Sequence, residues 1–349
     1  MTKIRVAVIG YGLAGRVFHA PFIAVDEAYE LAMIVTSNPE RAQAAASLYP
    51  NTAIVPSVDQ VFADGANIDL VVVASPNDTH VPLATRALEA GKDVVIDKPI
   101  APLASQAQEL VDRAKELGRT VTVFQNRRWD GDFLTVKQIL ESGELGQVLQ
   151  FESTFTKQGR RPGKHWKNEL PTGEGGGIAY DLAPHLIDQA VQLFGPVVHS
   201  YAELDADKEN LANDNDAFFA LTHKSGVRSR LWMSNRIDLT GPRLKVIGTE
   251  GTFETFGLDI QESQLIAGLI PGAPGYGVDT EFPTGLLTQD GDVQEVAKLT
   301  GQYPDFYAGL AIALKDRTDP PVDPADAIAT LEIIELGITN FVGTRATTV

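Results

Sequence analysis

The chain opens with an apolar run, a cluster of glycines and then a helical pattern. Ile4, Val6, Val8 and Ile9 form the run, which predicts a short strand buried on both faces. Gly10-Tyr11-Gly12-Leu13-Ala14-Gly15 follows, and helical spacing continues through Val17 and Phe18. A strand, a glycine turn and a helix in this order are typical of the phosphate-binding start of a dinucleotide fold. A plain strand–turn–helix connection without a ligand is the alternative.

Each glycine of this turn has a physical role in the dinucleotide interpretation. Gly10 permits the tight turn, Gly12 lets the backbone approach a pyrophosphate, and Gly15 lets the helix pack against the strand. The positive end of the helix then faces the anion. We therefore expect Gly10, Tyr11, Gly12, Leu13 and Gly15 to contact a cofactor.

Short apolar runs continue to alternate with helical patterns up to about residue 125. The expected strands are Leu31–Val35, Ile54–Val55, Asp69–Ala74, Asp93–Ile96 and Val121–Phe124, and the clearest helix is Ala104–Leu117. Alternation of strands and helices predicts a parallel sheet covered by helices. We assign residues 1–125 to an N-terminal Rossmann dinucleotide-binding domain.

From about Val148 onward, the strand-like segments are no longer each followed by a helix. They are Val148–Thr156, Val197–Leu204, Ala217–Thr222, Val227–Met233, Leu244–Gly248 and Gly251–Phe256. This pattern predicts a C-terminal α/β domain with a large, mostly antiparallel open sheet over residues 126–349. Helices are expected at Ile178–Phe194, Tyr303–Lys315 and from Asp323 to about Val342, the last as a candidate to pack back on the first domain. Gly268–Asp292 is rich in Gly and Pro and is expected to be irregular.

Composition narrows the possible partners. The chain has 349 residues, with 29 Lys and Arg against 46 Asp and Glu, a net charge of -17. That balance disfavours nucleic acids and anionic membranes, although local groups can still hold an anionic cofactor. The chain has no cysteine, which excludes disulfides and thiolate ligands. With no signal-peptide pattern and no apolar run near the roughly 20 residues of a membrane span, a cytoplasmic enzyme is expected.

The end of the second strand bears on cofactor choice. An NAD-binding fold usually carries an acidic residue there, about 20 residues beyond the glycine turn. This chain has Thr36-Ser37-Asn38 and then Arg41. Ser37 can donate a hydrogen bond to a 2′-phosphate and Arg41 can pair with it, so NADP is preferred over NAD. Alternatively, Arg41 simply faces solvent.

Two further strand ends carry polar residues, at the edge where such sheets bind ligands. Ser75, Pro76 and Asn77 follow the third buried strand, and His80 starts the next helix. His80 is either a cofactor contact or a helix-start residue held by hydrogen bonds. Lys98 follows the fourth buried strand and is the first candidate for chemistry, with a surface lysine beside a turn proline as the alternative.

Asp181 and His185 form the second candidate group. They lie four residues apart in the helix after Gly175-Gly176-Gly177, so they share one face. A carboxylate beside an imidazole orients the ring, which suits a general base. Pro184 is expected to lie in or near the first helical turn. A helix-surface salt bridge is the alternative for this pair.

Taken together, these motifs resemble those of the glucose–fructose oxidoreductase, inositol dehydrogenase and MocA (Gfo/Idh/MocA) family. They are the glycine turn, Ala74-Ser75-Pro76 with His80, Asp97-Lys98-Pro99 (the family usually has Glu-Lys-Pro), and the glycines before Asp181 and His185. Asn126–Asp130 and Arg161-Pro162-Gly163 with Trp166 are similar to the NADP-dependent scyllo-inositol dehydrogenase branch.

The resemblance implies an NAD(P)-dependent sugar or polyol dehydrogenase that assembles into a homodimer or homotetramer, with the large sheet as the interface. It implies Lys98, Asp181 and His185 as catalytic residues, Lys98 also beside the cofactor, and Arg127, His165 and Trp166 as further substrate contacts. No metal site is expected. An aldose, deoxysugar or anhydro-sugar substrate is the alternative, and a non-catalytic NAD(P)-binding regulator is the alternative from another class.

Overall fold

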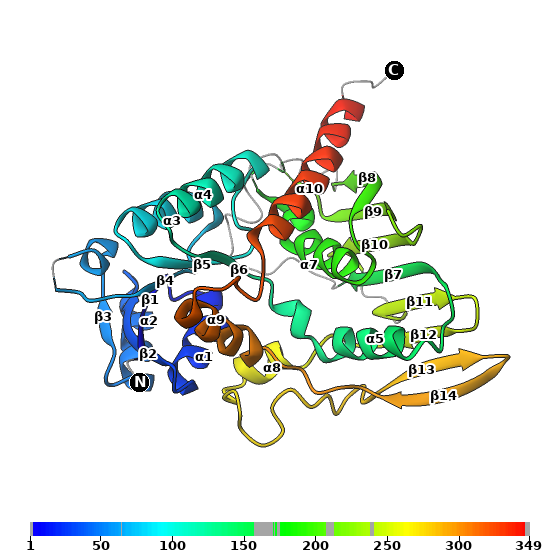
Figure 1. Ribbon diagram of the computed structural model, residues 1–349, viewed down its shortest axis with the longest axis horizontal. Helices are drawn as coiled ribbons and strands as arrows, with labels where there is room; N and C mark the ends of the chain where they lie inside the picture. Colours follow the sequence, from blue (N-terminus) through cyan, green and yellow to red (C-terminus); the bar gives the residue numbers. More distant parts are fainter. Residues whose placement is uncertain are drawn as a thin grey trace. The chain divides into compact units, whose positions relative to one another are not determined.

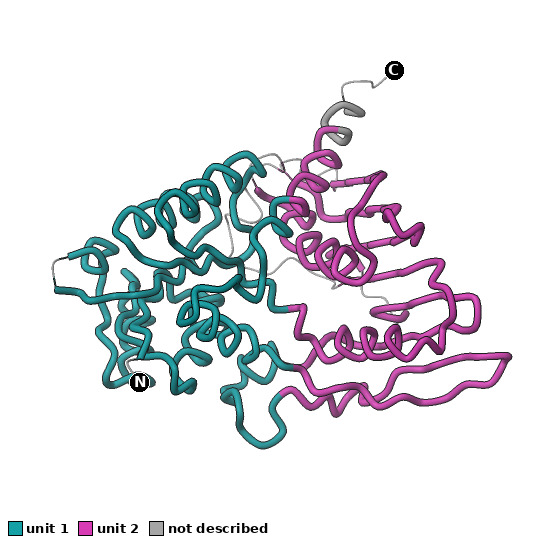
Figure 2. The backbone as a smooth tube through the Cα atoms, viewed as in Figure 1, with its two compact units in different colours: residues 1–126, 261–276, 302–328 teal, residues 127–260, 277–301, 329–349 magenta. Residues whose placement is uncertain are grey.

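A computed structural model describes residues 3–63, 65–156, 170, 172, 175–206, 213–237 and 241–345. The chain forms two compact units (Figure 2). Unit 1 comprises residues 1–126, 261–276 and 302–328, and unit 2 comprises residues 127–260, 277–301 and 329–349. The chain first passes from unit 1 to unit 2 after residue 126 and later returns to unit 1 twice. Neither unit is therefore one continuous stretch of sequence.

Unit 1 is built on a parallel sheet in the order β3-β2-β1-β4-β5-β6. Its strands are β1 (Ile4–Ile9), β2 (Tyr29–Val35), β3 (Ala53–Val55), β4 (Leu70–Val73), β5 (Asp93–Asp97) and β6 (Val121–Phe124). Every neighbouring pair runs parallel. This is the strand order of a Rossmann dinucleotide-binding fold, in which ligands bind at the carboxyl ends of the strands. The prediction of an N-terminal Rossmann fold is confirmed.

Helices cover both faces of this sheet, with α3 and α4 on one side and α1 and α9 on the other (Figure 1). The helical segments of unit 1 are η1 (Ala14–His19), α1 (Ala20–Val25), α2 (Pro39–Leu48), η2 (Val58–Val61), η3 (Asn77–Thr79), α3 (His80–Glu89), α4 (Ala104–Glu116), α8 (Gln261–Ile266) and α9 (Pro304–Asp316). The side of α1 and α9 is aromatic, since Phe22 stacks on Tyr307 and Phe124 meets Phe306 edge-on. A late segment of the sequence thus completes the core around the first strands.

Unit 2 is built on an open sheet in the order β14-β13-β12-β11-β7-β10-β9-β8. Its strands are β7 (Val148–Thr156), β8 (Val197–Asp205), β9 (Asp216–His223), β10 (Arg228–Ser234), β11 (Leu244–Gly248), β12 (Thr252–Thr255), β13 (Thr284–Gln289) and β14 (Asp292–Ala297). Within this sheet, as far as its strands are described, only the pair β7–β10 is parallel. The prediction of a large, mostly antiparallel sheet in a second domain is confirmed.

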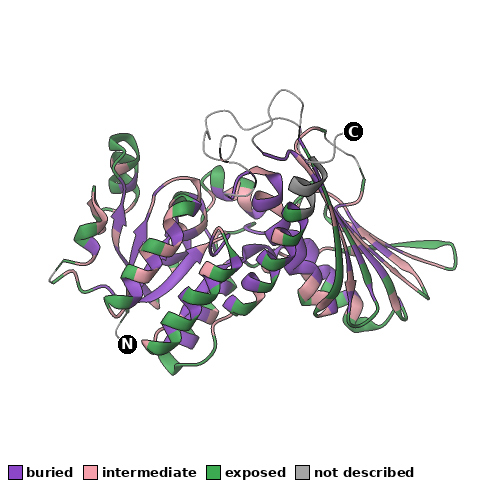
Figure 3. Cartoon of the chain, turned by 90° about the horizontal axis from the view of Figure 1, so that it is seen from above, coloured by how far each residue is buried: buried purple, intermediate pink, exposed green. Residues whose placement is uncertain are grey.

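One face of this sheet is covered by helices. The helical segments of unit 2 are η4 (Asn126–Trp129, which begins at the last residue of unit 1), α5 (Gly131–Ser142), α7 (Gly177–Phe194) and the larger part of α10 (Pro324–Arg345). Helix α7 packs on β7, β9 and β10, and α5 packs on β11 and β12. Along β9 the residues alternate between buried and half-buried, as expected for a strand with one covered face (Figure 3). No helix among the described residues is long and apolar enough to cross a membrane.

The expectation that Gly268–Asp292 is irregular is wrong for its last part. Residues Thr284–Gln289 form β13, which pairs antiparallel with β14. The two residues between these strands, Asp290 and Gly291, both have positive φ, 49° and 90°. Asp-Gly is the sequence that a two-residue hairpin turn favours. The signal was present in the sequence, but the surrounding Gly and Pro residues obscured it.

Candidate active site

The glycine turn after β1 is shaped by close backbone contacts at two of its three glycines. Gly10 has φ +96°, and a Cβ there would lie 2.5 Å from the carbonyl oxygen of Ala74. A Cβ on Gly15 would lie 1.9 Å from the carbonyl oxygen of Gly10. At Gly12, by contrast, the nearest heavy atom to a Cβ would be Arg41 Nη1 at 3.9 Å. The backbone at Gly12 is therefore open to an approaching ligand, which fits the pyrophosphate of a dinucleotide.

The residues next to these glycines differ in which of their atoms can contact a cofactor. Tyr11 is 1% exposed, so only its backbone can face a cofactor. Leu13 is half-buried and directly precedes η1, a π-helical segment. Arg16 N donates to Gly12 O at 3.1 Å and closes the first turn of the helix.

The residues after β2 place a positive charge beside this opening. Ser37 and Arg41 are both exposed. Asn38 Oδ1 accepts a hydrogen bond from Arg41 N at 2.9 Å, which caps α2 and fixes the backbone that carries the guanidinium. The chain thus holds an exposed cation next to open backbone, as binding of a phosphorylated nucleotide requires.

The loop after β4 is held by hydrogen bonds of its own. Ser75 Oγ lies 2.6 Å from Thr79 Oγ1, Pro76 is exposed and Asn77 is buried. His80 is 1% exposed, with Nδ1 2.7 Å from Pro99 O and Nε2 2.9 Å from Ser75 O. Both ring nitrogens therefore face the protein's own carbonyl groups, the second of the two alternatives considered for this residue. Direct contact with a cofactor stays a prediction.

Lys98 follows β5 directly and is half-buried. Its backbone N–H donates to Asp97 Oδ1 at 2.9 Å, and the Lys98–Pro99 peptide bond is cis. The carboxyl ends of parallel neighbouring strands lie at one edge of a sheet, so Lys98 shares an edge with the glycine turn and the Ser75 loop.

Sequence reasoning missed His19, at the end of η1. It is fully buried, and Nδ1 lies 2.7 Å from the hydroxyl of Tyr307. Burial lowers the pKa of His19 to about 4, so the ring is neutral at neutral pH. Nε2 lies 4.0 Å from Asp97 Oδ1 and has no hydrogen-bond partner among the described residues. A single histidine between apolar residues gives no sequence signal for this role.

Asp181 and His185 both lie on α7 in unit 2, where Asp181 is half-buried and His185 is 6% exposed. The expectation that Pro184 lies in or near the first turn is wrong, because α7 begins at Gly177 and Pro184 lies inside the helix, about two turns from its start. A proline there cannot donate the hydrogen bond to residue 180. Tertiary packing of this largely buried helix outweighs that local cost. Because the helix begins at Gly177, His185 lies about two turns beyond its start.

The start of α7 is capped by a residue distant in sequence. Ala179 N donates to Asp214 Oδ2 at 2.8 Å, and Thr172 Oγ1 donates to Asp214 Oδ1 at 3.0 Å. A Cβ on Gly177 would lie 2.0 Å from Asp214 Oδ1, so a glycine is needed there for the carboxylate to approach. Burial raises the pKa of Asp214 to about 6, although these hydrogen bonds act in the opposite direction.

Helix α7 is also anchored one turn beyond His185. Arg128 forms a two-pronged ion pair with Asp188 at 2.8 and 2.5 Å, and Gln189 Nε2 donates to Arg127 O at 2.9 Å. Arg127 itself is buried, pairs with Asp130 at 3.0 Å and lies over the ring of Phe155. Its contact with a substrate stays a prediction.

The structure describes only some of the remaining predicted site residues. His165 and Trp166 lie outside the described residues. Lys98 belongs to unit 1 while Asp181 and His185 belong to unit 2, and their meeting around one cofactor stays a prediction. Across the described ranges, no group of three or more His, Cys, Asp or Glu side chains could hold a metal ion.

The fold and the glycine turn define a dinucleotide-binding protein. Comparison with known proteins identifies its family. Residues 4–125 match the model of the oxidoreductase family with an NAD-binding Rossmann fold, and residues 133–254 match the GFO/IDH/MocA C-terminal domain. The chain belongs to the Gfo/Idh/MocA family of oxidoreductases, as its motifs predicted.

Individual relatives cover nearly the whole chain. The oxidoreductase YdgJ of Escherichia coli (strain K12) is 41% identical over 340 residues, 96% of each chain. The scyllo-inositol 2-dehydrogenase (NADP(+)) IolW of Bacillus subtilis (strain 168) is 30% identical over 336 residues, 95% of this chain and 92% of the relative. A crystal structure of an oxidoreductase from Bacillus cereus superposes with a TM-score of 0.85 at 28% identity, covering 97% of this chain and 96% of that one.

Proposed function

We propose that the protein is an NADP-preferring dehydrogenase that acts on a secondary alcohol of a cyclic polyol, with scyllo-inositol as the best candidate. The observation that carries the proposal is the shared sheet edge that presents both the open Gly12 backbone and Lys98. Similarity to a relative named for this reaction supports the substrate class.

The preference for NADP rests on the residues after β2. An acidic residue that would repel a 2′-phosphate is absent from Thr36-Ser37-Asn38, and the Arg41 guanidinium lies beside the turn. Ser37 donates a hydrogen bond to the phosphate and Arg41 supplies the charge. NAD then binds through the same turn with lower affinity.

The proposed chemistry divides between the two units. His185 removes the hydroxyl proton as a general base, and Lys98 donates a hydrogen bond to the same oxygen as negative charge develops. Asp181 orients the imidazole or a neighbouring hydroxyl of the substrate. The bound nicotinamide supplies the acceptor for the hydride.

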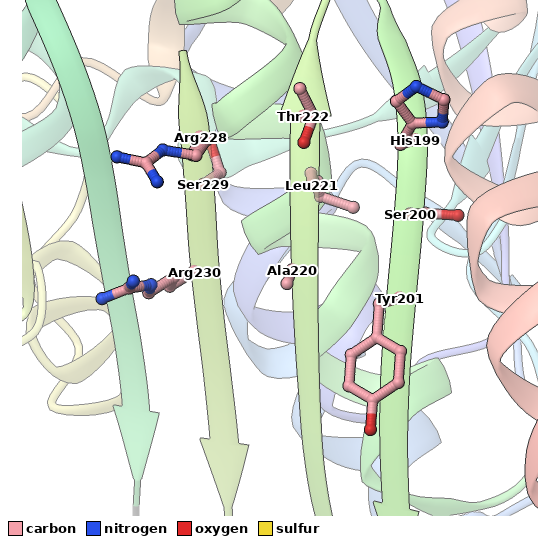
Figure 4. A pocket seen from close by; sticks show the side chains of 9 residues that line it. All are labelled: His199, Ser200, Tyr201, Ala220, Leu221, Thr222, Arg228, Ser229 and Arg230. Carbon is pink, nitrogen blue, oxygen red and sulfur yellow. The ribbon is translucent and has the colours of Figure 1, made fainter. Parts of the chain in front are cut away.

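The proposal includes a homodimer or homotetramer that forms through the open face of the unit 2 sheet. This face bears a shallow pocket over β8, β9 and β10, where Tyr201, Ala220 and Arg230 lie side by side (Figure 4). The same row continues through Glu152, Lys245 and Glu254 with alternating charge. The side chain of Tyr201 on this face is more than half exposed, which favours a partner surface.

The test is a set of initial rates with NADP and NAD against a panel of inositols, aldoses, deoxysugars and anhydro-sugars. Lys98→Met and His185→Asn are expected to lose at least about 100-fold in kcat while NADPH affinity persists. Lys137→Met, an exposed lysine on α5, is the matched control and is expected to behave as wild type. Normal turnover by either site variant contradicts the mechanism.

The same panel separates the alternatives. Activity on a linear or anhydro-sugar alone moves the assignment to the second substrate class. Tight NADPH binding without turnover on any panel member favours a cofactor-binding regulator. Light scattering of the purified protein reports the subunit count directly.

A further inference from the structure

We propose that His80 and His19 are positioning residues for Lys98, His80 through a hydrogen bond to Pro99 O and His19 through its electrostatic interaction with the Asp97 carboxylate. The inference rests on the proposed function of Lys98. Both histidines are buried, and they belong to unit 1 together with the segment Asp97-Lys98-Pro99.

His80 holds the carboxyl side of Lys98. Its Nδ1 lies 2.7 Å from the carbonyl oxygen of Pro99, and its Nε2 lies 2.9 Å from that of Ser75. Carbonyl oxygens only accept hydrogen bonds, so the ring donates to both when protonated and to one when neutral. The protonated ring links the loop after β4 to the loop after β5, and the neutral ring still bonds the loop after β5 when its proton is on Nδ1.

His19 acts on the amino side of Lys98 through Asp97. The carboxylate oxygen that accepts the Lys98 N–H at 2.9 Å is the same oxygen that lies 4.0 Å from His19 Nε2. With its proton on Nε2, the neutral ring accepts from the Tyr307 hydroxyl at Nδ1 and presents an N–H dipole to the carboxylate. Tyr307 is in turn held by Tyr29, whose hydroxyl donates to Tyr307 O at 2.7 Å.

The 4.0 Å separation is too long for a hydrogen bond and short enough for one additional methylene to close. Asp97→Glu therefore brings a carboxylate within reach of Nε2. This gives the inference a gain-of-contact test in addition to loss-of-contact tests.

For catalysis, the consequence is that the position of the Lys98 ammonium group is well defined. Lys98 has a long, flexible side chain, so its reach is defined only if its backbone is fixed. A displacement of about 1 Å at a reacting group can cost roughly 100-fold in rate. The buried imidazoles of His80 and His19 supply that fixation from within unit 1.

The experiment compares His80→Gln and His19→Phe with His223→Gln as the matched control. His223 is also 1% exposed with both ring nitrogens hydrogen-bonded, to Gly195 O and Ser229 Oγ, but it lies on β9. We expect His80→Gln to lower kcat 10- to 100-fold and His19→Phe to lower it 3- to 10-fold. NADPH affinity should change by a smaller factor than kcat does, and His223→Gln should lower stability without lowering kcat.

Equal effects of His80→Gln and His223→Gln on kcat at matched folded fraction overturn the inference. Asp97→Glu is expected to raise the Tm, and that gain should vanish in the background of His19→Phe; a gain independent of His19 overturns the His19 part. If Lys98→Met itself retains turnover, the proposed function fails, and that result is distinct from normal kcat in the histidine variants of an enzyme that needs Lys98.

Discussion

Gly12 and Gly15 lie in the same turn after β1, but the same substitution, glycine to alanine, should have opposite effects at the two positions. Gly12→Ala places a methyl group in open space, with Arg41 Nη1 at 3.9 Å as its nearest neighbour. Gly15→Ala places one 1.9 Å from the carbonyl oxygen of Gly10, a backbone atom that no side-chain rotation can move. The first variant should therefore lose function and keep stability, and the second should lose stability.

The magnitudes follow from these contacts. For Gly12→Ala the change in unfolding free energy should stay within about 0.5 kcal/mol, as for surface substitutions. A methyl group between backbone and pyrophosphate removes one hydrogen bond to a charged group, worth about 1.5–3 kcal/mol. The Kd for NADPH should therefore rise roughly 10- to 100-fold. Gly15→Ala should cost about 3 kcal/mol through overpacking.

The assay pairs thermal unfolding with a fluorescence titration of NADPH. Wild type should gain Tm on saturation with NADPH because the ligand binds only the folded state, and Gly12→Ala should lose most of that gain at the same concentration. A Gly12→Ala protein that unfolds like wild type and binds NADPH like wild type would refute the interpretation of the turn. A Gly12→Ala protein as unstable as Gly15→Ala would refute the geometry.

Three further outcomes follow from the described contacts. In initial-rate measurements, Arg41→Ala should raise the KM for NADP about tenfold and change the KM for NAD less than twofold. An equal change in both KM values would show that Arg41 does not bind the 2′-phosphate. Asp214 has its pKa raised from 3.8 to about 6, so its stabilising contribution is present at low pH and is lost as the pH rises from about 4 to 6. As the pH rises through that window, the free energy of unfolding of Asp214→Asn should thus increase relative to that of wild type by up to about 3 kcal/mol. A difference in Tm between the two proteins that does not change with pH would contradict this prediction. The wild type alone does not isolate this effect, because His19 titrates the other way between about 4 and 6.5. Arg128→Ala should cost about 3 kcal/mol in a denaturant titration because it leaves Asp188 buried without its two-pronged partner, and an unchanged midpoint would show that the pair is dispensable.

Much of the fold could be predicted from the sequence because it depends on residues that are close together in the chain. The glycine turn, the apolar runs and the Asp-Pro start of α10 depend on neighbours within a few residues, and the Rossmann and open-sheet architectures followed from them. Asp323 Oδ1 indeed accepts a hydrogen bond from Ala325 N at 2.9 Å. The family followed from motifs of the same local kind.

The rest depends on contacts between residues far apart in the sequence. The cap of α7 comes from Asp214, 35 residues after the N–H that it accepts, so neither the helix start nor the interior position of Pro184 could be read locally. The contacts of His19 with Tyr307 and Asp97 join residues that no spacing rule connects. The roles of Lys98, Asp181 and His185 themselves stay predictions.

The aromatic core of unit 1 has a consequence for biosynthesis. Phe22 and Phe124 pack against Tyr307 and Phe306, residues that leave the ribosome only after most of unit 2. The nascent Rossmann segment must therefore keep these rings from aggregating until the chain is almost finished, by transient burial or with a chaperone. A gene fragment cut at residue 126 would encode a sheet missing one of its covers.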